Sequence, residues 1–240
     1  MPTRLHHLLS AQTRFDLWYH LRQRGDWRGK AQRVEGDMYI KLNFAMRPEE
    51  GKATTFARAH TNIPIPFVID NVTVTVNGRR ETALVLERLP GRSPEITSEI
   101  RKKIADQLSS LLAQLRAIPP PEDGAVCGFV GGPLHCEQVT ELVWDTIKKA
   151  HSQSHRICFS HGDLGAHNVL IDDEFNVTAI IDWEMASWMP EYWEFTKSTF
   201  QPIYRGKKSM WFQIMSNVFP QYALERRAEL FVWRYREHYS

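Results

Sequence analysis

The sequence predicts an α+β chain of two lobes, a small antiparallel-sheet lobe over residues 1–88 and a mainly helical lobe over residues 89–240. The first third carries short segments rich in β-branched residues that alternate with polar ones, as half-buried strands do. After Pro90-Gly91 the apolar residues instead recur at the period of an α-helix. A change from one period to the other at a Pro-Gly pair indicates a boundary between a sheet lobe and a helical lobe.

The first lobe is expected to combine helices with a small sheet. Residues 1–24 have apolar side chains at helical spacing, and residues 38–42 (MYIKL) have the character of a strand. Residues 49–60 predict a helix, and the prolines within 63–66 (IPIP) stop it because proline cannot continue a helix. The two alternating segments that flank Asn77-Gly78 predict a hairpin, since this pair tolerates the positive φ of a tight turn.

The second lobe is expected to begin with an amphipathic helix over residues 96–117, which the prolines of 119–123 end. A further helix is expected around 137–151. Residues 158–183 read as short strands and turns, and residues 190–240 as helices.

The composition excludes several classes of partner. The 30 basic and 28 acidic side chains give a net charge of +2, so no nucleic-acid-binding surface is expected. No apolar run reaches the ~18 residues that a membrane helix needs, and Leu8-Leu9 is too short for a signal peptide. Three cysteines without a CxxC pair fit a reducing compartment. We therefore expect a cytoplasmic protein without a membrane partner; the sequence does not indicate an oligomeric state.

One segment carries a chemical signature. Residues 161–168 read His-Gly-Asp-Leu-Gly-Ala-His-Asn, which fits the phosphotransferase pattern H-x-D-L-x-x-x-N at each fixed position. Asp182 follows 14 residues after Asn168, at the end of a strand–turn–strand segment. Because a hairpin of that size brings the chain back beside its start, we expect Asn168 and Asp182 to meet.

These residue types suit phosphoryl transfer, which needs positioning and charge neutralisation more than covalent chemistry. Mg²⁺ prefers carboxylate and amide oxygens, so Asn168 and Asp182 are expected to bind it. Asp163 is expected to accept the proton of an attacking hydroxyl, and His161 to brace the loop. Glu184 is an open candidate, either for a second metal ion or as a solvent-facing side chain.

The run FSHGDLGAHNVLIDDEFNVTAIIDWE resembles the aminoglycoside phosphotransferase and choline kinase-like family, closest to its fungal-type small-molecule phosphotransferases, within the protein-kinase-like fold. The resemblance extends from residue 38 to about residue 200. It implies a bilobal kinase-like fold, ATP and Mg²⁺ as cofactors, Asp163 as catalytic base, and Asn168 and Asp182 as metal ligands.

The same resemblance assigns the nucleotide site. MYIKL resembles the family's third strand, which implies that Lys41 binds the α- and β-phosphates of ATP. Glu50 falls where the family carries the glutamate that pairs with this lysine, with Glu49 as its close rival. LVLERLPG resembles the hinge, where the Glu87 carbonyl and the Leu89 N–H would hold the adenine.

The sequence departs from the family pattern at the phosphate loop and at residue 162, and the second departure bears on the substrate. The loop that covers the phosphates has two candidates, residues 24–29 (RGDWRG) and Glu35-Gly36-Asp37. Gly162 stands where many protein kinases carry the arginine that reads an activation-loop phosphate, and only 58 residues follow Asp182. Both observations favour a small-molecule acceptor over a protein.

The C-terminal tail indicates the kind of acceptor. Residues 185–240 hold 14 of the 27 aromatic residues, with eight basic and five acidic side chains. This composition favours a hydroxyl acceptor that is apolar or aromatic over a polycationic aminoglycoside. Two alternatives remain open: a catalytically silent pseudokinase that only binds, and a kinase fold redirected to secondary-metabolite chemistry.

Overall fold

The chain divides into two compact units. Unit 1 comprises Met1–Pro90 together with Ala179–Glu184, and unit 2 comprises Gly91–Thr178 together with Met185–Ser240. The segment Ala179–Glu184 therefore joins the sheet unit although it lies far along the chain. The computed structural model describes residues 9–23, 31–34, 38–43, 49–121, 127–128, 154–200 and 210–237.

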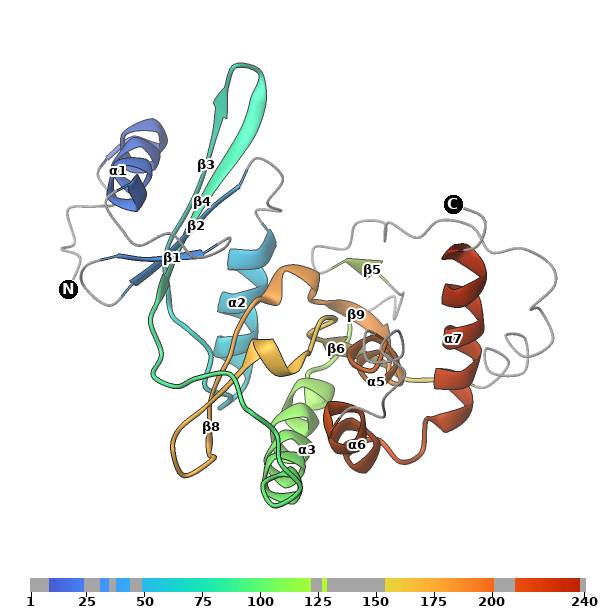
Figure 1. The fold of residues 1–240 in the computed structure, drawn as a ribbon. Helices are drawn as coiled ribbons and strands as arrows, with labels where there is room; N and C mark the ends of the chain where they lie inside the picture. Colours follow the sequence, from blue (N-terminus) through green and yellow to red (C-terminus); the bar gives the residue numbers. More distant parts are fainter. Residues whose placement is uncertain are drawn as a thin grey trace. The chain divides into compact units, whose positions relative to one another are not determined.

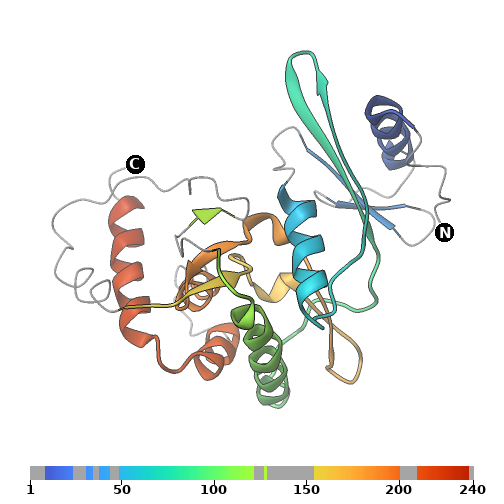
Figure 2. The same cartoon turned by 180° about the vertical axis from the view of Figure 1, so that it is seen from behind.

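Unit 1 is built on a four-stranded antiparallel sheet in the order β1-β2-β4-β3, with one helix on each side in both views (Figures 1 and 2). Its elements are α1 (Ala11–Gln23), β1 (Ala31–Val34), β2 (Met38–Asn43), α2 (Glu49–His60), β3 (Val68–Val76) and β4 (Arg79–Glu87).

Helix α1 packs on one face of this sheet through Phe15 and Trp18, which lie in a core with Ile40, Ala83 and Val85. Side chains on a strand alternate between the two faces, so the odd-numbered residues of β4 turn toward α1 and the even-numbered ones away.

A buried carboxylate ties α1 to β3. Asp70 is 6% exposed; its Oδ1 accepts from Arg14 at 2.8 Å and its Oδ2 from the Trp18 indole at 2.7 Å. A buried charge needs such partners.

Helix α2 packs on the opposite face, which Lys41 and Leu84 share as paired neighbours on β2 and β4. Gly51 permits the close approach, because a Cβ at this position would lie 2.4 Å from Asn71 Nδ2 and 3.0 Å from Leu84 Cδ1. The helix therefore presents its first turn to the strand that carries Lys41.

The predicted elements of unit 1 are confirmed where the structure describes them. Asn77 and Gly78 have φ of 50° and 76°, the left-handed turn expected between β3 and β4. The predicted 1–24 helix is seen from Ala11, and its first eight residues lie outside the described residues. The predicted strand and helix appear as β2 and α2.

Unit 2 is mainly helical with short strand pairs. Its elements are α3 (Arg101–Ala117), β5 (Cys127–Gly128), β6 (Ile157–Ser160), the 3₁₀ helix η3 (Ala166–Asn168), β7 (Val169–Ile171), β9 (Ser187–Pro190), α5 (Trp193–Ser198), α6 (Met210–Val218) and α7 (Ala223–Glu237). β9 lies between β5 and β6 in an antiparallel sheet, and β7 pairs with β8 (Val177–Ile180). A second 3₁₀ helix, η4 (Trp183–Met185), follows β8.

Helix α3 is the centre of this unit and packs against β6 and α6. It begins at Arg101, so the prediction of a start at residue 96 was wrong. Upstream, Arg92 pairs with Ile171 through two backbone hydrogen bonds, and this keeps the chain extended before a turn at 98–100.

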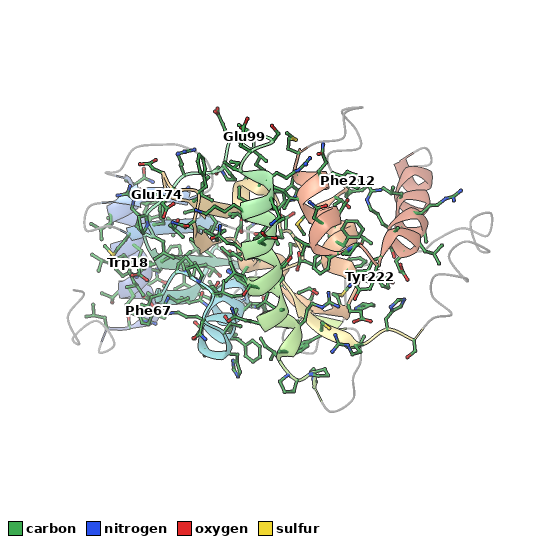
Figure 3. All side chains as sticks on the ribbon, turned by 90° about the horizontal axis from the view of Figure 1, so that it is seen from below. Trp18, Phe67, Glu99, Glu174, Phe212 and Tyr222 are labelled. Atoms are coloured by element: carbon green, nitrogen blue, oxygen red, sulfur yellow. The ribbon has the colours of Figure 1, made fainter. Side chains whose placement is uncertain are left out.

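Apolar and aromatic side chains fill unit 2, including Ile104, Leu108 and Phe159, each at most 1% exposed. Figure 3 labels Phe212 on α6 and Tyr222 just before α7. Within the described residues, no helix is long and apolar enough to cross a membrane. The predicted helix around 137–151 lies outside the described residues.

Candidate active site

Lys41 lies between two carboxylates in unit 1. Its Nζ is 2.7 Å from Glu50 Oε1 and 2.8 Å from Asp182 Oδ1. The side chains of Lys41, Glu50 and Asp182 are 13%, 1% and 33% exposed. Asp182 is 141 residues away in the sequence, so this contact depends on the return of Ala179–Glu184 to unit 1.

The structure places Glu50, rather than Glu49, beside Lys41. Both begin α2, but Glu50 is buried while Glu49 remains half-exposed. Neighbours along a helix point about 100° apart, so only one of them can face β2. The alternative that the sequence left open is thereby resolved for the ion pair.

The charges around this pair shift both pKa values upward. Burial alone would lower the pKa of Lys41, but the charges of Glu50 and Asp182 and their hydrogen bonds outweigh it and raise that pKa. Burial raises the pKa of Glu50, which Lys41 opposes and the charges of Asp182 and Glu184 reinforce. The ammonium therefore stays charged.

Three carboxylates lie close together beside Lys41. Glu50, Asp182 and Glu184 each offer an oxygen, and these atoms lie within 4.8 Å of one another. The Oε2 atom of Glu50 is buried without a hydrogen-bond partner. Three carboxylates lie together and two of them pair with the one ammonium, so a further cation is electrostatically favourable here.

Asp182 is held in an unusual backbone conformation. Its φ of 69° is left-handed, a region that Asp tolerates better than most residues. It follows β8 and precedes η4, in which the Trp183 indole donates to the Ile180 carbonyl at 3.1 Å. This hydrogen bond spans Asp182, because its donor follows Asp182 in the sequence and its acceptor precedes it.

The predicted catalytic loop, residues 161–168, lies in unit 2 and is internally hydrogen-bonded. The Asp163 N–H lies 3.2 Å from His161 Nδ1, which accepts it. Asn168 Nδ2 donates to the Asp163 carbonyl at 2.8 Å and lies 3.5 Å from Asp163 Oδ2. The structure thus brings Asp163 and Asn168 together, with His161 fully buried beneath them.

Gly162 occupies a position in this loop that a side chain would strain. Its φ is +80°, and a Cβ there would lie 2.4 Å from the Met185 carbonyl oxygen. Side chains are strongly disfavoured in such a position.

Two residues that the sequence did not single out hold the loop from outside. Glu194 on α5 accepts the N–H of His161 at 2.6 Å and that of Gly162 at 3.3 Å. The Trp211 indole on α6 donates to the Leu164 carbonyl at 3.1 Å. No local pattern in the sequence indicates these contacts, because they join residues that are 33 and 47 positions apart.

The structure describes the expected hinge but not the two candidates for the phosphate loop. Glu87 ends β4. Its N–H donates to the Phe67 carbonyl at 2.9 Å, and the Phe67 N–H donates to Glu87 Oε2 at 3.0 Å. Leu89 follows two residues later and is half-buried. Both candidates for the phosphate loop, residues 24–29 and 35–37, lie outside the described residues.

The site residues thus fall into two groups. Lys41, Glu50 and Asp182 contact one another in unit 1, whereas Asp163 and Asn168 contact one another in unit 2. The expected meeting of Asn168 with Asp182 stays a prediction.

Comparisons with known proteins bear on this fold. A model of the phosphotransferase enzyme family matches residues 132–217. No curated protein matches the chain. The fold is similar to that of aminoglycoside phosphotransferase APH(4)-Ia, with a TM-score of 0.62 and 15% identity over 92% of this chain and 88% of the other.

Two other solved structures are similar. Aminoglycoside phosphotransferase APH(3'')-Id from Streptomyces rimosus, in complex with ADP and streptomycin, has a TM-score of 0.59 and 15% identity over 93% of this chain and 98% of the other. A candidate fructosamine-3-kinase from Haemophilus somnus has a TM-score of 0.54 and 14% identity over 88% and 81%.

At these identities the structures establish the fold, while the family model matches the segment that contains residues 161–168 and Asp182. The chain has the α+β, kinase-like fold of the aminoglycoside phosphotransferases, and its resemblance to the phosphotransferase enzyme family is confirmed.

Proposed function

We propose that the protein is a small-molecule kinase that transfers the γ-phosphoryl group of ATP to a hydroxyl, with Mg²⁺ as the metal. The observation that carries this proposal is the Lys41 ammonium, held by Glu50, nine residues away in the sequence, and by Asp182, 141 residues away. A charged lysine fixed in this way suits the phosphates of a nucleotide, because its position is set before the nucleotide arrives.

The reaction assigns one role to each predicted residue. Asp163 accepts the proton of the acceptor hydroxyl as its oxygen bonds to the γ-phosphorus and the bond from that phosphorus to the β–γ bridging oxygen breaks, leaving ADP. Lys41 binds the α- and β-phosphates, and Glu50 keeps the ammonium in place. The internal hydrogen bonds of the loop fix the Asp163 backbone before the acceptor binds.

The donor atoms fit a hard cation. Asn168 uses its amide nitrogen on Asp163, which directs the amide oxygen to the role of ligand. Asp182 gives Oδ1 to Lys41, and its second oxygen is the atom offered to the metal. We therefore assign Asn168 and Asp182 as the residues that hold Mg²⁺. When bound, the ion neutralises charge on the phosphates.

We assign adenine recognition to the end of β4. The backbone there is anchored by the Phe67 contacts of Glu87, so the Glu87 carbonyl and the Leu89 N–H are presented from a fixed strand end. The complex of the structural relative APH(3'')-Id with ADP supports a nucleotide in this fold.

We further propose that the acceptor is not a polycationic aminoglycoside. The relative APH(3'')-Id binds streptomycin, but the described acidic side chains of this tail serve the chain itself. Glu191 pairs with Arg116 and Arg156, Glu225 lies 3.5 Å from His155, and Glu194 holds the catalytic loop. These carboxylates are thus engaged within the fold and do not offer a set of free negative charges to a polycation. We therefore propose an acceptor with at most one positive charge.

The test uses [γ-³²P]ATP, Mg²⁺ and a panel of sugars, amino alcohols, aromatic alcohols and aminoglycosides. Wild-type protein should label a non-aminoglycoside alcohol, and the product should gain one phosphoryl group by mass. Asp163→Asn should bind ATP with unchanged affinity and label nothing. ATP binding without transfer to any acceptor would favour the pseudokinase alternative, and labelling of aminoglycosides alone would contradict the acceptor class.

A further inference from the structure

The loop formed by residues 161–168 carries two histidines, and the fold uses only one of them. His161 is fully buried, and its Nδ1 accepts the Asp163 N–H. His167, in contrast, is exposed and lies on η3, directly before Asn168. Its ring has no hydrogen-bond or ion-pair partner among the described residues. Both of its ring nitrogens are therefore available to a ligand.

The ring of His167 lies directly on the backbone of Gly165. A Cβ added at Gly165 would lie 2.3 Å from His167 Cε1 and 2.5 Å from Nδ1, and the next nearest atom is Nε2 of the same ring at 3.4 Å. The backbone conformation does not require glycine, since a φ of −93° and a ψ of 166° suit any residue. The missing side chain of Gly165 therefore makes room for the imidazole.

Gly165 is hydrogen-bonded to both functional residues of the loop. Its N–H donates to the Asp163 carbonyl at 2.8 Å, and its carbonyl accepts the Asn168 N–H at 3.0 Å. Asn168 Nδ2 donates to the same Asp163 carbonyl, also at 2.8 Å. The imidazole thus lies on the backbone segment that connects the proposed base to the proposed metal ligand, and hydrogen bonds fix that segment.

A hydrogen-bond donor at this position suits the group that is transferred. In the proposed reaction, the γ-phosphoryl group lies between the hydroxyl that Asp163 deprotonates and the metal ion that Asn168 binds. Its oxygens carry negative charge, yet residues 161–168 contain no lysine or arginine. Imidazole has at least one N–H in either protonation state, so His167 can donate to such an oxygen. Hydrogen bonds to a charged acceptor are stronger than those to a neutral one.

We propose that His167 is a phosphate-binding residue: its ring, placed on the bare backbone of Gly165, donates a hydrogen bond to an oxygen of the transferred γ-phosphoryl group. The inference rests on the proposed function for the identity of this ligand. The imidazole keeps its proton throughout, because the proton of the acceptor hydroxyl goes to Asp163. No covalent bond to His167 forms or breaks.

Two substitutions remove this contact in different ways. His167→Phe keeps a ring on Gly165 but has no N–H. Gly165→Ala keeps the imidazole and displaces it, because the added Cβ occupies the position of the ring. His20→Phe, at an exposed histidine of α1, is the matched control. Because His167 is exposed, His167→Phe should keep the wild-type melting temperature within about 2 °C.

The first measurement compares the affinities for AMP-PNP and ADP by calorimetric titration in the presence of Mg²⁺, because only AMP-PNP carries a γ-phosphoryl group. His167→Phe should weaken AMP-PNP binding at least tenfold and change ADP binding less than twofold. Gly165→Ala should weaken AMP-PNP binding at least fivefold, and His20→Phe should change neither affinity. Unchanged AMP-PNP binding in His167→Phe, or an equal loss for both nucleotides, would overturn the proposal.

The double variant Gly165→Ala/His167→Phe tests whether the two changes act through one contact. Their losses should not add, so the double variant should bind AMP-PNP within about twofold of the weaker single variant. Additive losses would show that Gly165→Ala acts by another route, and would contradict the placement of the imidazole on Gly165 as the cause.

The second measurement, Mg²⁺-ATP hydrolysis with water in place of the acceptor, separates this proposal from the proposed function. His167→Phe should lower kcat/KM for ATP at least tenfold. A loss confined to the KM for an acceptor would overturn the proposal, because it would place the ring at the acceptor. A wild-type protein with the expected pattern of affinities but without turnover would contradict only the kinase function. A wild-type protein that binds neither nucleotide would contradict both.

Discussion

A methyl group added at Gly162 should disrupt the catalytic loop more than any other small change to it. Gly162→Ala forces alanine into φ +80°, which costs about 1–2 kcal/mol. Its Cβ would also lie 2.4 Å from the Met185 carbonyl oxygen and 3.1 Å from that carbonyl carbon. These are backbone atoms that cannot rotate away, and overpacking of this kind costs a further ~1–3 kcal/mol. Together, we expect about 2–5 kcal/mol of destabilisation.

The matched control is Gly165→Ala in the same loop. Gly165 has an ordinary φ of −93°, and its added Cβ would meet only the exposed His167 ring, which can turn aside. Urea unfolding should show the large loss for Gly162→Ala and at most ~1 kcal/mol for Gly165→Ala. Equal stability of the two variants would refute the conclusion that the bend at Gly162 is sterically required.

Three other predictions concern the charged and packed groups. Glu50→Gln should raise the KM for ATP or lower kcat at least tenfold, because it removes the charge that holds Lys41. Glu49→Gln on the same helix is the control and should change both values less than twofold. Equal effects of the two substitutions in steady-state assays would contradict the pairing of Glu50 with Lys41. Alanine normally favours a helix over glycine by ~1 kcal/mol. Gly51→Ala should nevertheless lower the urea midpoint of unfolding, because its Cβ would lie 2.4 Å from Asn71 Nδ2. A raised midpoint would show that the Asn71 side chain moves aside. Burial raises the pKa of Glu194 from 4.5 to about 7, so the folded chain keeps a proton that the unfolded chain has released between these pH values. The free energy of unfolding should therefore fall across this range by roughly 3 kcal/mol at most, and Glu194→Gln should lack this fall when unfolding is measured from pH 4 to 8; parallel curves would contradict the shift.

Local patterns made much of the fold predictable. The hairpin through Asn77-Gly78 and the helix over Glu49–His60 depend on turn chemistry and periodicity within a few residues, and both appear as expected. The contact between Asp163 and Asn168 depends on a spacing of only five residues, so the sequence could indicate it, whereas the catalytic role of this loop stays a prediction.

The contacts that the sequence did not predict join distant segments. Glu194 lies 33 residues from His161, and Trp211 lies 47 residues from Leu164. No period or motif states which face of α5 or α6 meets the loop, because tertiary packing decides it. The choice between Glu49 and Glu50 likewise depended on which face of α2 turns toward β2, and the sequence does not state this.

The sequence also did not predict the positive φ of Gly162 and Asp182. A glycine suggests freedom but not a positive φ, and an aspartate at the end of a strand suggests an ordinary turn. The values of +80° and 69° occur at residues that contact distant parts of the chain, since Gly162 lies against the Met185 carbonyl and Asp182 pairs with Lys41.

The most direct test of the proposed metal site is a titration of Mn²⁺ in the presence of AMP-PNP, followed by electron paramagnetic resonance. If Asn168 and Asp182 bind the same ion, then Asn168→Ala and Asp182→Asn should each weaken its binding at least tenfold, while Asp173→Asn, at an exposed carboxylate, should not. Wild-type affinity in either of the first two variants would contradict the account, because it would place one of the two residues away from the metal.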